Sequence, residues 1–233
     1  MAARPGFPCG LTRPNLRAMC GRFTITHPNE ALAALFAAVL GNDLPDSPRF
    51  NICPTNSVAV VTSSDGRRLR SMRWGLIPAW YKAANDGPLI INARSDTVAV
   101  KPAFRDAIRT RRCILPASGF YEWSAGPDKA RLPWYISRAD GAPMAFGALW
   151  SHWGDGDTCA MVTVEGGPNM AGIHDREPVI LAAADWPLWL GEAGHGAATL
   201  MKPTAAGVLQ AHRVGVAVNS NRAAGAQLIA ALA

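Results

Sequence analysis

The stretch Met19-Cys20-Gly21-Arg22-Phe23 is the one around which we expect the rest of the chain to be organised. Initiator methionine is usually removed ahead of a small side chain, so a start at Met19 would make Cys20 the first residue. Its α-amine would then have a pKa near 8, leaving roughly a tenth of it neutral at pH 7, against about one lysine amine in a thousand or fewer. An amine and a thiol on adjacent carbons can convert an aldehyde to an imine and then to a thiazolidine. An interior cysteine cannot, because its nitrogen is part of an amide.

The segment before this stretch differs in composition from the rest of the chain. Residues 1–18 contain three Pro and two Gly, and they lack the apolar run of a secretory signal. We interpret residues 1–19 as a leader or a mis-called start that is absent from the working protein or removed from it. Residues 20–233 would then form one domain. The alternative is that Cys20 is simply one of five ordinary cysteines.

Size and composition indicate a soluble globular protein. Of the 233 residues, 49% are hydrophobic and 17% are charged, which is typical of a compact domain with a sizeable core. No apolar run reaches the roughly 18 residues of a membrane helix. The cysteines form no Cys-x-x-Cys pair, so we expect neither a zinc site nor a disulfide framework. Cys53, Cys113 and Cys159 are expected to be buried thiols in a cytoplasmic protein.

The net charge of +6 is distributed unevenly. Three arginines lie within residues 1–18 with no acid to offset them. From Cys20 onward 20 Lys and Arg face 17 Asp and Glu, which leaves +3. That balance does not by itself indicate nucleic-acid binding. A local basic groove is an open alternative, with the arginines of residues 105–112 as one source.

Short apolar segments separated by turn residues predict many short strands. Ser63-Ser64-Asp65-Gly66 and Ala139-Asp140-Gly141 are typical hairpin turns, and Thr26 or Asn29 would cap a helix that Gly41 ends. We predict an α+β fold, a single domain of mixed, mostly antiparallel sheets curled into a barrel-like core with peripheral helices. The expected strands are residues 23–25, 57–62, 67–73, 89–91, 113–116, 133–138, 144–150, 158–164 and 214–218. The expected helices are residues 31–40, 102–109, 185–190 and 204–208, and an Ala-rich helix at the end of the chain.

The stretch Trp74-Gly75-Leu76-Ile77-Pro78-Ala79-Trp80-Tyr81 is expected to be a loop, because Gly75 and Pro78 do not fit a regular helix or a central strand. Large aromatic side chains in loops are commonly buried. The alternative is that Trp74 or Trp80 is a stacking platform for unpaired bases, worth about 1–3 kcal/mol per base.

Four polar residues stand out as candidate site residues. Asn92 follows the expected strand 89–91, and Asn51 either holds a turn or lines a site. Glu122 lies between two aromatic residues, where partial desolvation would raise its pKa and favour proton donation near neutral pH. The alternative for Glu122 is an edge-strand carboxylate facing water. His174 lies in a polar turn before a strand, a usual place for functional groups, although a lone His of this kind is more often structural.

Six short motifs occur in one order along the chain: Cys20-Gly21-Arg22-Phe23, Asn51-Ile52-Cys53-Pro54, Trp74-Gly75-Leu76-Ile77-Pro78-Ala79-Trp80, Ile91-Asn92-Ala93-Arg94, Gly119-Phe120-Tyr121-Glu122-Trp123 and Ile173-His174-Asp175-Arg176-Glu177-Pro178. Together they resemble the SRAP family, the SOS-response-associated peptidases now described as abasic-site processing proteins. The resemblance runs from Cys20 to the C-terminus. It implies an SRAP-like fold and the capture of abasic sites in single-stranded DNA as a covalent DNA–protein cross-link, which protects the lesion in the DNA damage response.

The resemblance also implies a role for each matching position. Cys20 would form the thiazolidine with the deoxyribose aldehyde, and Asn92 would hydrogen-bond the sugar-derived adduct. Glu122 would protonate the ring oxygen and help to expose the aldehyde. His174 would lie beside the sugar and its 3′ phosphate, with a part in imine chemistry and strand cleavage. DNA would be bound by Arg22, Asn51, Trp74 and Arg94: the arginines would grip phosphates, and Trp74 with neighbouring loop residues would stack on flanking bases or wedge them apart.

The family resemblance implies no metal and no organic cofactor, and abasic single-stranded DNA is the only partner it implies. We expect a monomer in the cytoplasm, associated with the nucleoid when bound to DNA. A lyase activity at abasic sites and a cysteine autopeptidase activity that frees Cys20 from its leader are further expectations. Met19 removal from a start at Met19 is the simpler route to a free Cys20.

Two other function classes fit the opening stretch. An N-terminal-nucleophile hydrolase, of the peptidase or glutamine amidotransferase type, can also begin with Met-Cys-Gly and use its amine as the general base for the thiol. The Asn-Ala-Arg and Tyr-Glu-Trp motifs disfavour that class. A non-catalytic single-strand binder would use the Trp and Arg residues for affinity alone, and its binding would be reversible and fully salt-sensitive.

Overall fold

The computed structural model describes residues 20–232, so the leader or mis-called start assigned to residues 1–19 lies outside the described residues. Most of the described elements are short strands, as expected. The strands are β1 (Arg22–Ile25), β2 (Val39–Leu40), β3 (Arg49–Ile52), β4 (Ser57–Ser63), β5 (Arg67–Trp74), β6 (Asn92–Arg94), β7 (Arg112–Ala117), β8 (Gly119–Ala125), β9 (Arg131–Arg138), β10 (Met144–Trp153), β11 (Gly156–Glu165), β12 (Arg176–Pro178) and β13 (Leu209–Arg213). The α-helices are α1 (Asn29–Phe36), α2 (Ala107–Thr110) and α3 (Trp186–Leu190).

Five strands close into a barrel in the order β11-β10-β7-β4-β5, because β5 also pairs with β11. This closing pairing is parallel and joins Arg73 to Thr158 and Trp74 to Cys159. Strands β7, β10 and β11 are continuous apolar runs that are buried on both faces over most of their length. Such runs need cover on both sides, which a closed barrel with outer elements provides. The predicted barrel-like core is confirmed.

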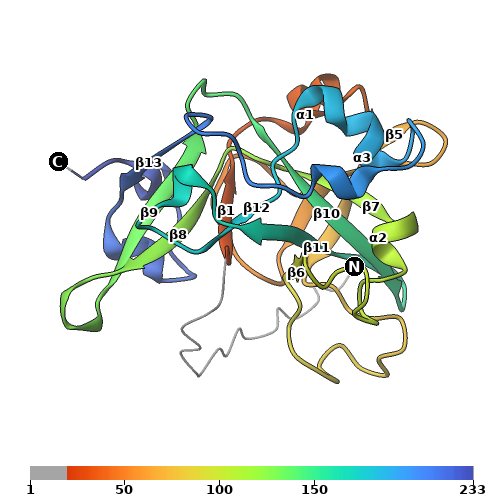
Figure 1. Ribbon diagram of the computed structural model, residues 1–233, viewed down its shortest axis with the longest axis horizontal. Helices are drawn as coiled ribbons and strands as arrows, with labels where there is room; N and C mark the ends of the chain where they lie inside the picture. Colours follow the sequence, from red (N-terminus) through yellow and green to blue (C-terminus); the bar gives the residue numbers. More distant parts are fainter. Residues whose placement is uncertain (1–19, 233) are drawn as a thin grey trace, which may run out of the picture.

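A second sheet, in the order β13-β9-β8-β1-β3, lies against the barrel (Figure 1). Strand β1 pairs antiparallel with β8, with Arg22 opposite Tyr121 and Phe23 opposite Phe120. The Phe23 ring meets the Trp74 ring edge-on at 5.1 Å between ring centroids, which ties this sheet to the end of β5. The stretch that follows Cys20 is therefore a central strand rather than a terminal appendage.

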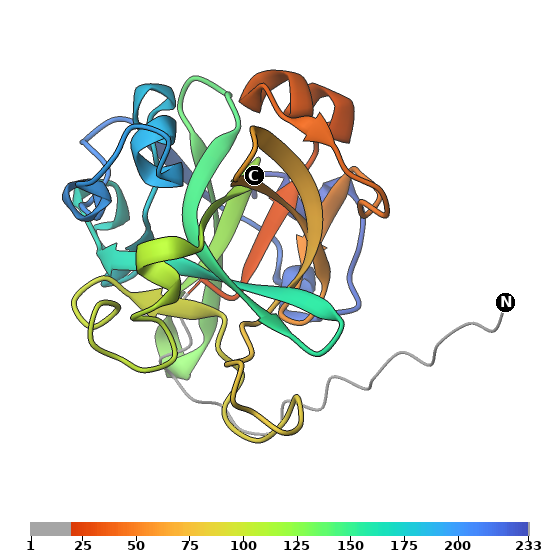
Figure 2. The same cartoon turned by 90° about the vertical axis from the view of Figure 1, so that its right-hand side faces the viewer.

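The helices lie at the periphery. Figures 1 and 2 show α1, α2 and α3 outside the strands, as predicted. Within residues 20–232, no helix has the length and apolar character needed to cross a membrane. The three cysteines expected to be buried, Cys53, Cys113 and Cys159, are all buried.

The helix expected at residues 31–40 is shorter and begins earlier, which corrects the prediction. Helix α1 ends at Phe36, because Ala37 adopts a left-handed conformation with φ of 49°. The next residues, Val39 and Leu40, form the edge strand β2 beside β5. Asn29 does not cap the helix with its side chain, since its Nδ2 donates to Pro45 O at 3.0 Å.

Several expected elements are wrong because pairing between distant segments outweighed local pattern. The segments 133–138 and 144–150 do not form a hairpin: β9 joins the second sheet, whereas β10 joins the barrel. The strand expected at 89–91 begins only at Asn92, where pairing with β11 starts. The final strand is β13, earlier than the expected 214–218, and residues 216–219 and 226–229 are single 3₁₀ turns. Helix α2 covers residues 107–110, so only residues 107–109 of the expected helix 102–109 are helical, and residues 204–208 form no helix.

Candidate active site

The pairing of β1 with β8 brings Cys20 to Glu122. Continuing the register Arg22↔Tyr121 by two residues places Cys20 over the Glu122–Trp123 segment. The Cys20 main-chain nitrogen donates a hydrogen bond of 2.5 Å to Oε1 of Glu122, and both residues are 1% exposed. Residues 102 positions apart in the chain thus form one polar contact within an apolar surrounding. The sequence-predicted nucleophile and the sequence-predicted acid therefore lie together.

Glu122 is a buried acid, not an edge-strand side chain. Its strand β8 lies between β9 and β1, so both edges of the strand are paired. Burial raises the pKa of Glu122 to about 8, and main-chain N–H groups of Cys20 and Trp123 offset only part of that rise. The carboxyl therefore holds its proton at neutral pH. The expected desolvation of this carboxyl is confirmed, and the alternative of a water-facing carboxylate is wrong.

The Cys20 thiol is protonated as well. Burial raises its pKa well above the usual value, and the neighbouring Glu122 raises it further. Because the thiolate is the reactive form of cysteine, this environment disfavours a thiol that must attack first. A free Cys20 nitrogen would therefore be better suited than the thiol to begin a reaction.

Asn92 directly follows a residue that reaches the segment after Cys20. It opens β6, which runs parallel to β11 with Asn92 opposite Met161. Ile91, the preceding residue, contacts the segment after Cys20: a Cβ on Gly21 would sit 3.9 Å from Ile91 Cδ1. The side chain of Asn92 is half-buried, so it combines an ordered position with access from one side.

His174 precedes β12 and lines an open hollow of about 610 Å³ formed by residues 166–175. Its Nδ1 accepts a hydrogen bond of 3.1 Å from the main-chain N–H of Arg176. The same Nδ1 also lies 3.1 Å from Oδ1 of Asp175. Burial lowers the pKa of His174, which favours the neutral form of the ring.

Two charged residues connect His174 with Glu122. Arg131 lowers the pKa of both groups, whereas Asp175 raises the pKa of both. The charges of Arg131 and Asp175 thus act on both candidate site residues.

Arg22 and Asn51 have partners that the sequence did not predict. The Arg22 guanidinium donates to the carbonyl oxygens of Val218, Asn219 and Ser220, and also to Asn51 Oδ1 at 3.3 Å. Asn51 Nδ2 donates to Ser220 O at 3.1 Å and to the carbonyl of residue 223. Both residues hold the C-terminal segment against β1. A phosphate bound by Arg22 would have to compete with these carbonyl groups.

Arg94 is exposed and accessible. Its Nε and one terminal nitrogen donate to the two carboxylate oxygens of Asp96, at 3.1 Å and 2.6 Å. A surface pair of this kind is weak and exchanges readily with other anions. The position at the end of β6, two residues after Asn92, places the guanidinium at the same border of the site.

Trp74 is not a stacking platform, which corrects that interpretation. Its side chain is 0% exposed, and its indole N–H donates to Ile91 O at 3.1 Å. A ring with no accessible face cannot stack on a base. The expectation that an aromatic side chain in this stretch is buried is therefore correct for Trp74. Trp80, the other candidate, is 58% exposed.

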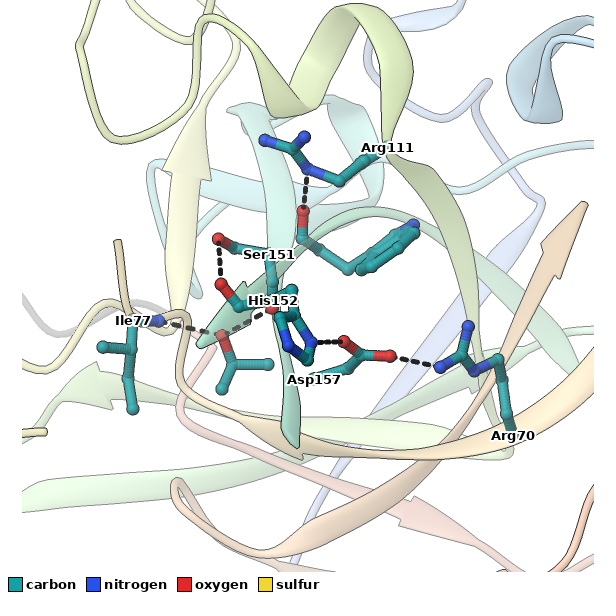
Figure 3. Close-up of polar contacts among 8 residues, drawn as sticks. Arg70, Ile77, Arg111, Ser151, His152 and Asp157 are labelled. Atoms are coloured by element: carbon teal, nitrogen blue, oxygen red, sulfur yellow. Dashed lines mark hydrogen bonds and ion pairs between the residues drawn. The ribbon is translucent and has the colours of Figure 1, made fainter. Parts of the chain in front are cut away.

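A second polar cluster contains Ser, His and Asp side chains but is not a catalytic triad (Figure 3). His152 Nδ1 lies 2.8 Å from Asp157 Oδ1, and Arg70 pairs with the other carboxylate oxygen. Ser151 Oγ contacts only the carbonyl of His152, at 3.5 Å, and does not reach the imidazole ring. A triad needs the hydroxyl to bond the imidazole. The cluster fastens the end of the β10–β11 hairpin.

Of the arginines in residues 105–112, Arg105 and Arg109 are exposed, whereas Arg111 and Arg112 are occupied by main-chain carbonyl groups. Arg112 donates to the carbonyls of Ile108 and Arg109, both at 2.8 Å, and Arg111 Nε donates to Trp150 O at 3.3 Å. These bonds hold α2 against the barrel. Among residues 20–232 no group of three or more His, Cys, Asp or Glu side chains is placed to hold a metal ion.

Sequence reasoning missed the residues that border the site from other strands. Arg131 belongs to no motif, and only the pairing of β9 with β8, with Arg131 opposite Ala125, brings it to the neighbourhood of Glu122. Arg176 lay within a quoted motif, but its contacts with Thr163 on β11 depend on the pairing of β12 with β11.

Comparisons with known proteins agree with the motif order. A family model described as SOS response associated peptidase (SRAP) matches residues 19–221. The abasic site processing protein YoaM of Bacillus subtilis is 35% identical, and the match covers 91% of this chain and 97% of that protein. The abasic site processing protein YedK of Escherichia coli is 33% identical over 72% of this chain and 79% of its own. A crystal structure of a protein from Bacteroides thetaiotaomicron, 22% identical, has the same fold, with a TM-score of 0.81 over 92% of this chain and 100% of that one.

Motif order, barrel topology and the match over most of the chain lead to one conclusion. The chain belongs to the SRAP family.

Proposed function

We propose that this protein processes abasic sites in single-stranded DNA by forming a covalent thiazolidine cross-link through Cys20. The observation that carries the proposal is the hydrogen bond of 2.5 Å between the Cys20 nitrogen and Glu122 Oε1. It joins the nucleophilic atom to a buried acid with a pKa of about 8. Family membership supports the proposal, since the relatives YoaM and YedK are named abasic site processing proteins.

The first step opens the sugar. An abasic deoxyribose is mostly a closed hemiacetal, and its ring oxygen must gain a proton before the aldehyde is free. Glu122 holds a proton at neutral pH because it is buried, which suits a general acid working near its own pKa. Half-buried Asn92 would hydrogen-bond the opened sugar from the β6 side.

The second step forms the imine. In a chain that begins at Cys20, the nitrogen beside Glu122 is an α-amine. Glu122 is protonated again at this stage, because the anomeric hydroxyl gave up its proton when the ring opened. The amine lone pair attacks the aldehyde carbon, and the carbinolamine loses its hydroxyl group as water, with the proton for that water supplied by Glu122 and replaced by a proton lost from the nitrogen. One C–N double bond replaces one C–O double bond, and no oxidant or reductant is needed.

The third step closes the ring. The Cys20 sulfur adds to the imine carbon, a C–S bond forms, and the thiol proton ends on the nitrogen. The thiol keeps its proton until this step because burial raises its pKa. The same raised pKa argues against the N-terminal-nucleophile hydrolase, which needs a readily ionised thiol for its first attack.

The remaining residues would position the strand. His174 would face the 3′ phosphate and sugar from the hollow of residues 166–175. From this position it would also assist elimination at an imine, which is a lyase side activity. Exposed Arg94 would exchange Asp96 for a phosphate, and exposed Trp80 would stack on a flanking base.

Cys20 needs a free nitrogen for this chemistry. We propose that the free nitrogen arises by removal of Met19 from a chain started there, with self-cleavage of a longer leader as the alternative route. The family match begins at residue 19, directly before Cys20, and this supports the first route. The intact mass of the protein purified from its own cells reports the first residue directly.

The test compares protein begun at Met19 with its Cys20→Ala variant on an abasic single-stranded oligonucleotide. We expect a cross-link that survives denaturing electrophoresis for the wild type. Cys20→Ala keeps a free α-amine but lacks the sulfur, so its imine should survive only after borohydride reduction. An equally stable adduct from Cys20→Ala without reduction would reject the thiazolidine. Ammonia release from glutamine, or turnover of a peptide added in trans, would favour the hydrolase instead.

A further inference from the structure

Arg131, the first residue of β9, is held above the ring of Trp123 on β8. Its guanidinium carbon lies 5.0 Å from the centroid of the Trp123 ring. The ring is itself fixed, because its indole N–H donates to Asn219 Oδ1 at 2.7 Å. A cation over an indole face gains about 0.5–1 kcal/mol at an exposed site. The stacking therefore restricts an otherwise flexible side chain.

The Arg131 guanidinium lacks a carboxylate partner within the part of the chain that the structure describes. The ion pairs found among residues 20–232 include Arg67, Arg70, Arg94, Arg105 and Arg138 but not Arg131. Stacking engages the flat face of a guanidinium and leaves its N–H edge directed outward. Arg131 is also exposed. It is a fixed cation whose hydrogen-bond donors are open to a ligand.

The location of Arg131 relates it to the candidate active site. Trp123 follows Glu122 directly on β8, and successive side chains of a strand point to opposite faces, so the stacked guanidinium lies across the sheet from the buried carboxyl. It shares the Trp123 ring with Arg22, two residues after Cys20, whose guanidinium carbon lies 5.8 Å from the ring centroid. The Arg131 charge also acts on Glu122 and on His174.

We propose that Arg131, stacked on Trp123, binds a phosphate of the single-stranded DNA beside the strand that follows Cys20. The inference rests on the proposed function for the identity of the ligand, a phosphodiester. A guanidinium suits this ligand because its fork donates two hydrogen bonds to two phosphate oxygens. Arg131 is on this view a binding and positioning residue rather than a proton donor.

Reversible binding of an undamaged single-stranded oligonucleotide tests the inference without requiring the covalent chemistry. The 233-residue chain and protein begun at Met19 are each compared with their Arg131→Gln and Arg68→Gln variants. Arg68 is a matched control, because it is an exposed strand arginine with the same charge, on the β4–β5 hairpin of the barrel. We expect Arg131→Gln to weaken binding at least about threefold and to lower the slope of log K against log salt by about one. Arg68→Gln should change neither quantity.

A second readout concerns the pH dependence of cross-linking. The groups whose charges act on Glu122 are Arg131 and Asp175, with the Cys20 nitrogen in hydrogen-bond contact; those acting on His174 are Asp175, Arg176 and Arg131. Loss of a positive charge raises the pKa of both groups, so Arg131→Gln should move the pH–rate profile to higher pH. Arg131→Lys keeps the charge and should restore the profile, but only part of the affinity, because an ammonium lacks the fork.

The outcomes separate this inference from the proposed function. Arg131→Gln protein that binds undamaged strand as tightly as wild type, with the same salt slope, overturns the role of Arg131 even if cross-linking proceeds. Wild-type protein that binds undamaged strand through Arg131 but forms no covalent product overturns the thiazolidine mechanism and leaves the phosphate contact standing. Wild-type protein that binds neither undamaged nor abasic single-stranded DNA overturns both the role of Arg131 and the proposed function.

Discussion

The nitrogen of Cys20 and the carboxyl group of Glu122 share one hydrogen bond of 2.5 Å, although the two residues are 102 positions apart. Strand pairing between β1 and β8 creates the contact, and burial of both residues excludes water from it. A carboxyl in this position is neutral at pH 7 because its charged form would lose its hydration. The proposed chemistry depends on this neutral state.

Replacing Glu122 by Gln should slow cross-linking without unfolding the protein. The amide keeps a hydrogen-bond acceptor for the Cys20 nitrogen but has no proton to give to the ring oxygen. General acid catalysis typically contributes about 10²–10⁴-fold, so we expect a loss of about 100-fold or more. Single-turnover rates on abasic oligonucleotide, resolved by denaturing gel, measure it. An unchanged rate with an unchanged unfolding midpoint would remove Glu122 from the mechanism.

The pH dependence of the same rate should be bell-shaped. The productive state holds one proton between the Cys20 amine and Glu122, so the two groups titrate as a pair. Because the pKa of Glu122 is raised to about 8, its proton is lost and the rate falls as pH rises through that value. Below neutrality a second proton occupies the amine, and the rate falls again. In Glu122→Gln the cross-linking rate should level off at alkaline pH instead of falling. If the rate of this variant still fell, the fall would belong to the titration of another group.

Two tryptophans in one stretch should respond in opposite ways. Trp74→Ala removes a fully buried ring and should lower the free energy of unfolding by about 3–5 kcal/mol. Trp80→Ala removes a ring that is 58% exposed, so it should leave stability nearly unchanged. If Trp80 stacks on a base, its loss weakens binding of single-stranded DNA by about 1–3 kcal/mol. Urea unfolding and fluorescence anisotropy measure the two effects, and equal DNA affinity of Trp80→Ala and wild type would exclude the stacking role.

Arg94 can be tested against a nearly identical pair elsewhere in the fold. Arg94 binds Asp96, and Arg138 binds Asp140, each through two nitrogens and across two residues. We expect Arg94→Gln to lower the salt slope of DNA binding by about one, because a phosphate contact is lost. Arg138→Gln makes the same change in charge away from the proposed site and should have no effect. Equal slopes for the two variants would mean that Arg94 contacts no phosphate.

Arg22 and Asn51 should stabilise the C-terminal segment jointly. Arg22→Ala leaves carbonyl groups of Val218, Asn219 and Ser220 without their cationic donor. Since a hydrogen bond to a charged group contributes about 1.5–3 kcal/mol, we expect a loss of that order in the free energy of unfolding. Asn51→Ala should cost less, and the two losses should not add, because Arg22 also donates to Asn51 Oδ1. If Arg22→Ala were as stable as the wild type, Arg22 would not hold the C-terminal segment in place.

The sequence by itself predicted several of the local elements, the burial of Glu122 and the family. Short apolar segments bounded by turn residues correctly predicted β4, β5, β7 and β11, because these strands are specified by their own residues and turns. The placement of Glu122 between two aromatic residues predicted its raised pKa, because desolvation follows from the apolar neighbours. The six motifs in order predicted the family.

Only the tertiary structure decided which distant segments pair. The sequence placed residues 133–138 and 144–150 in one hairpin, whereas β9 and β10 belong to different sheets. Trp74 was interpreted as a base platform, but β5 carries it into the core against Phe23. The contact between Cys20 and Glu122 and the place of Arg131 over Trp123 also depend on strand register. Register is set by which apolar faces bury one another across the whole domain, and no local stretch of sequence contains that information.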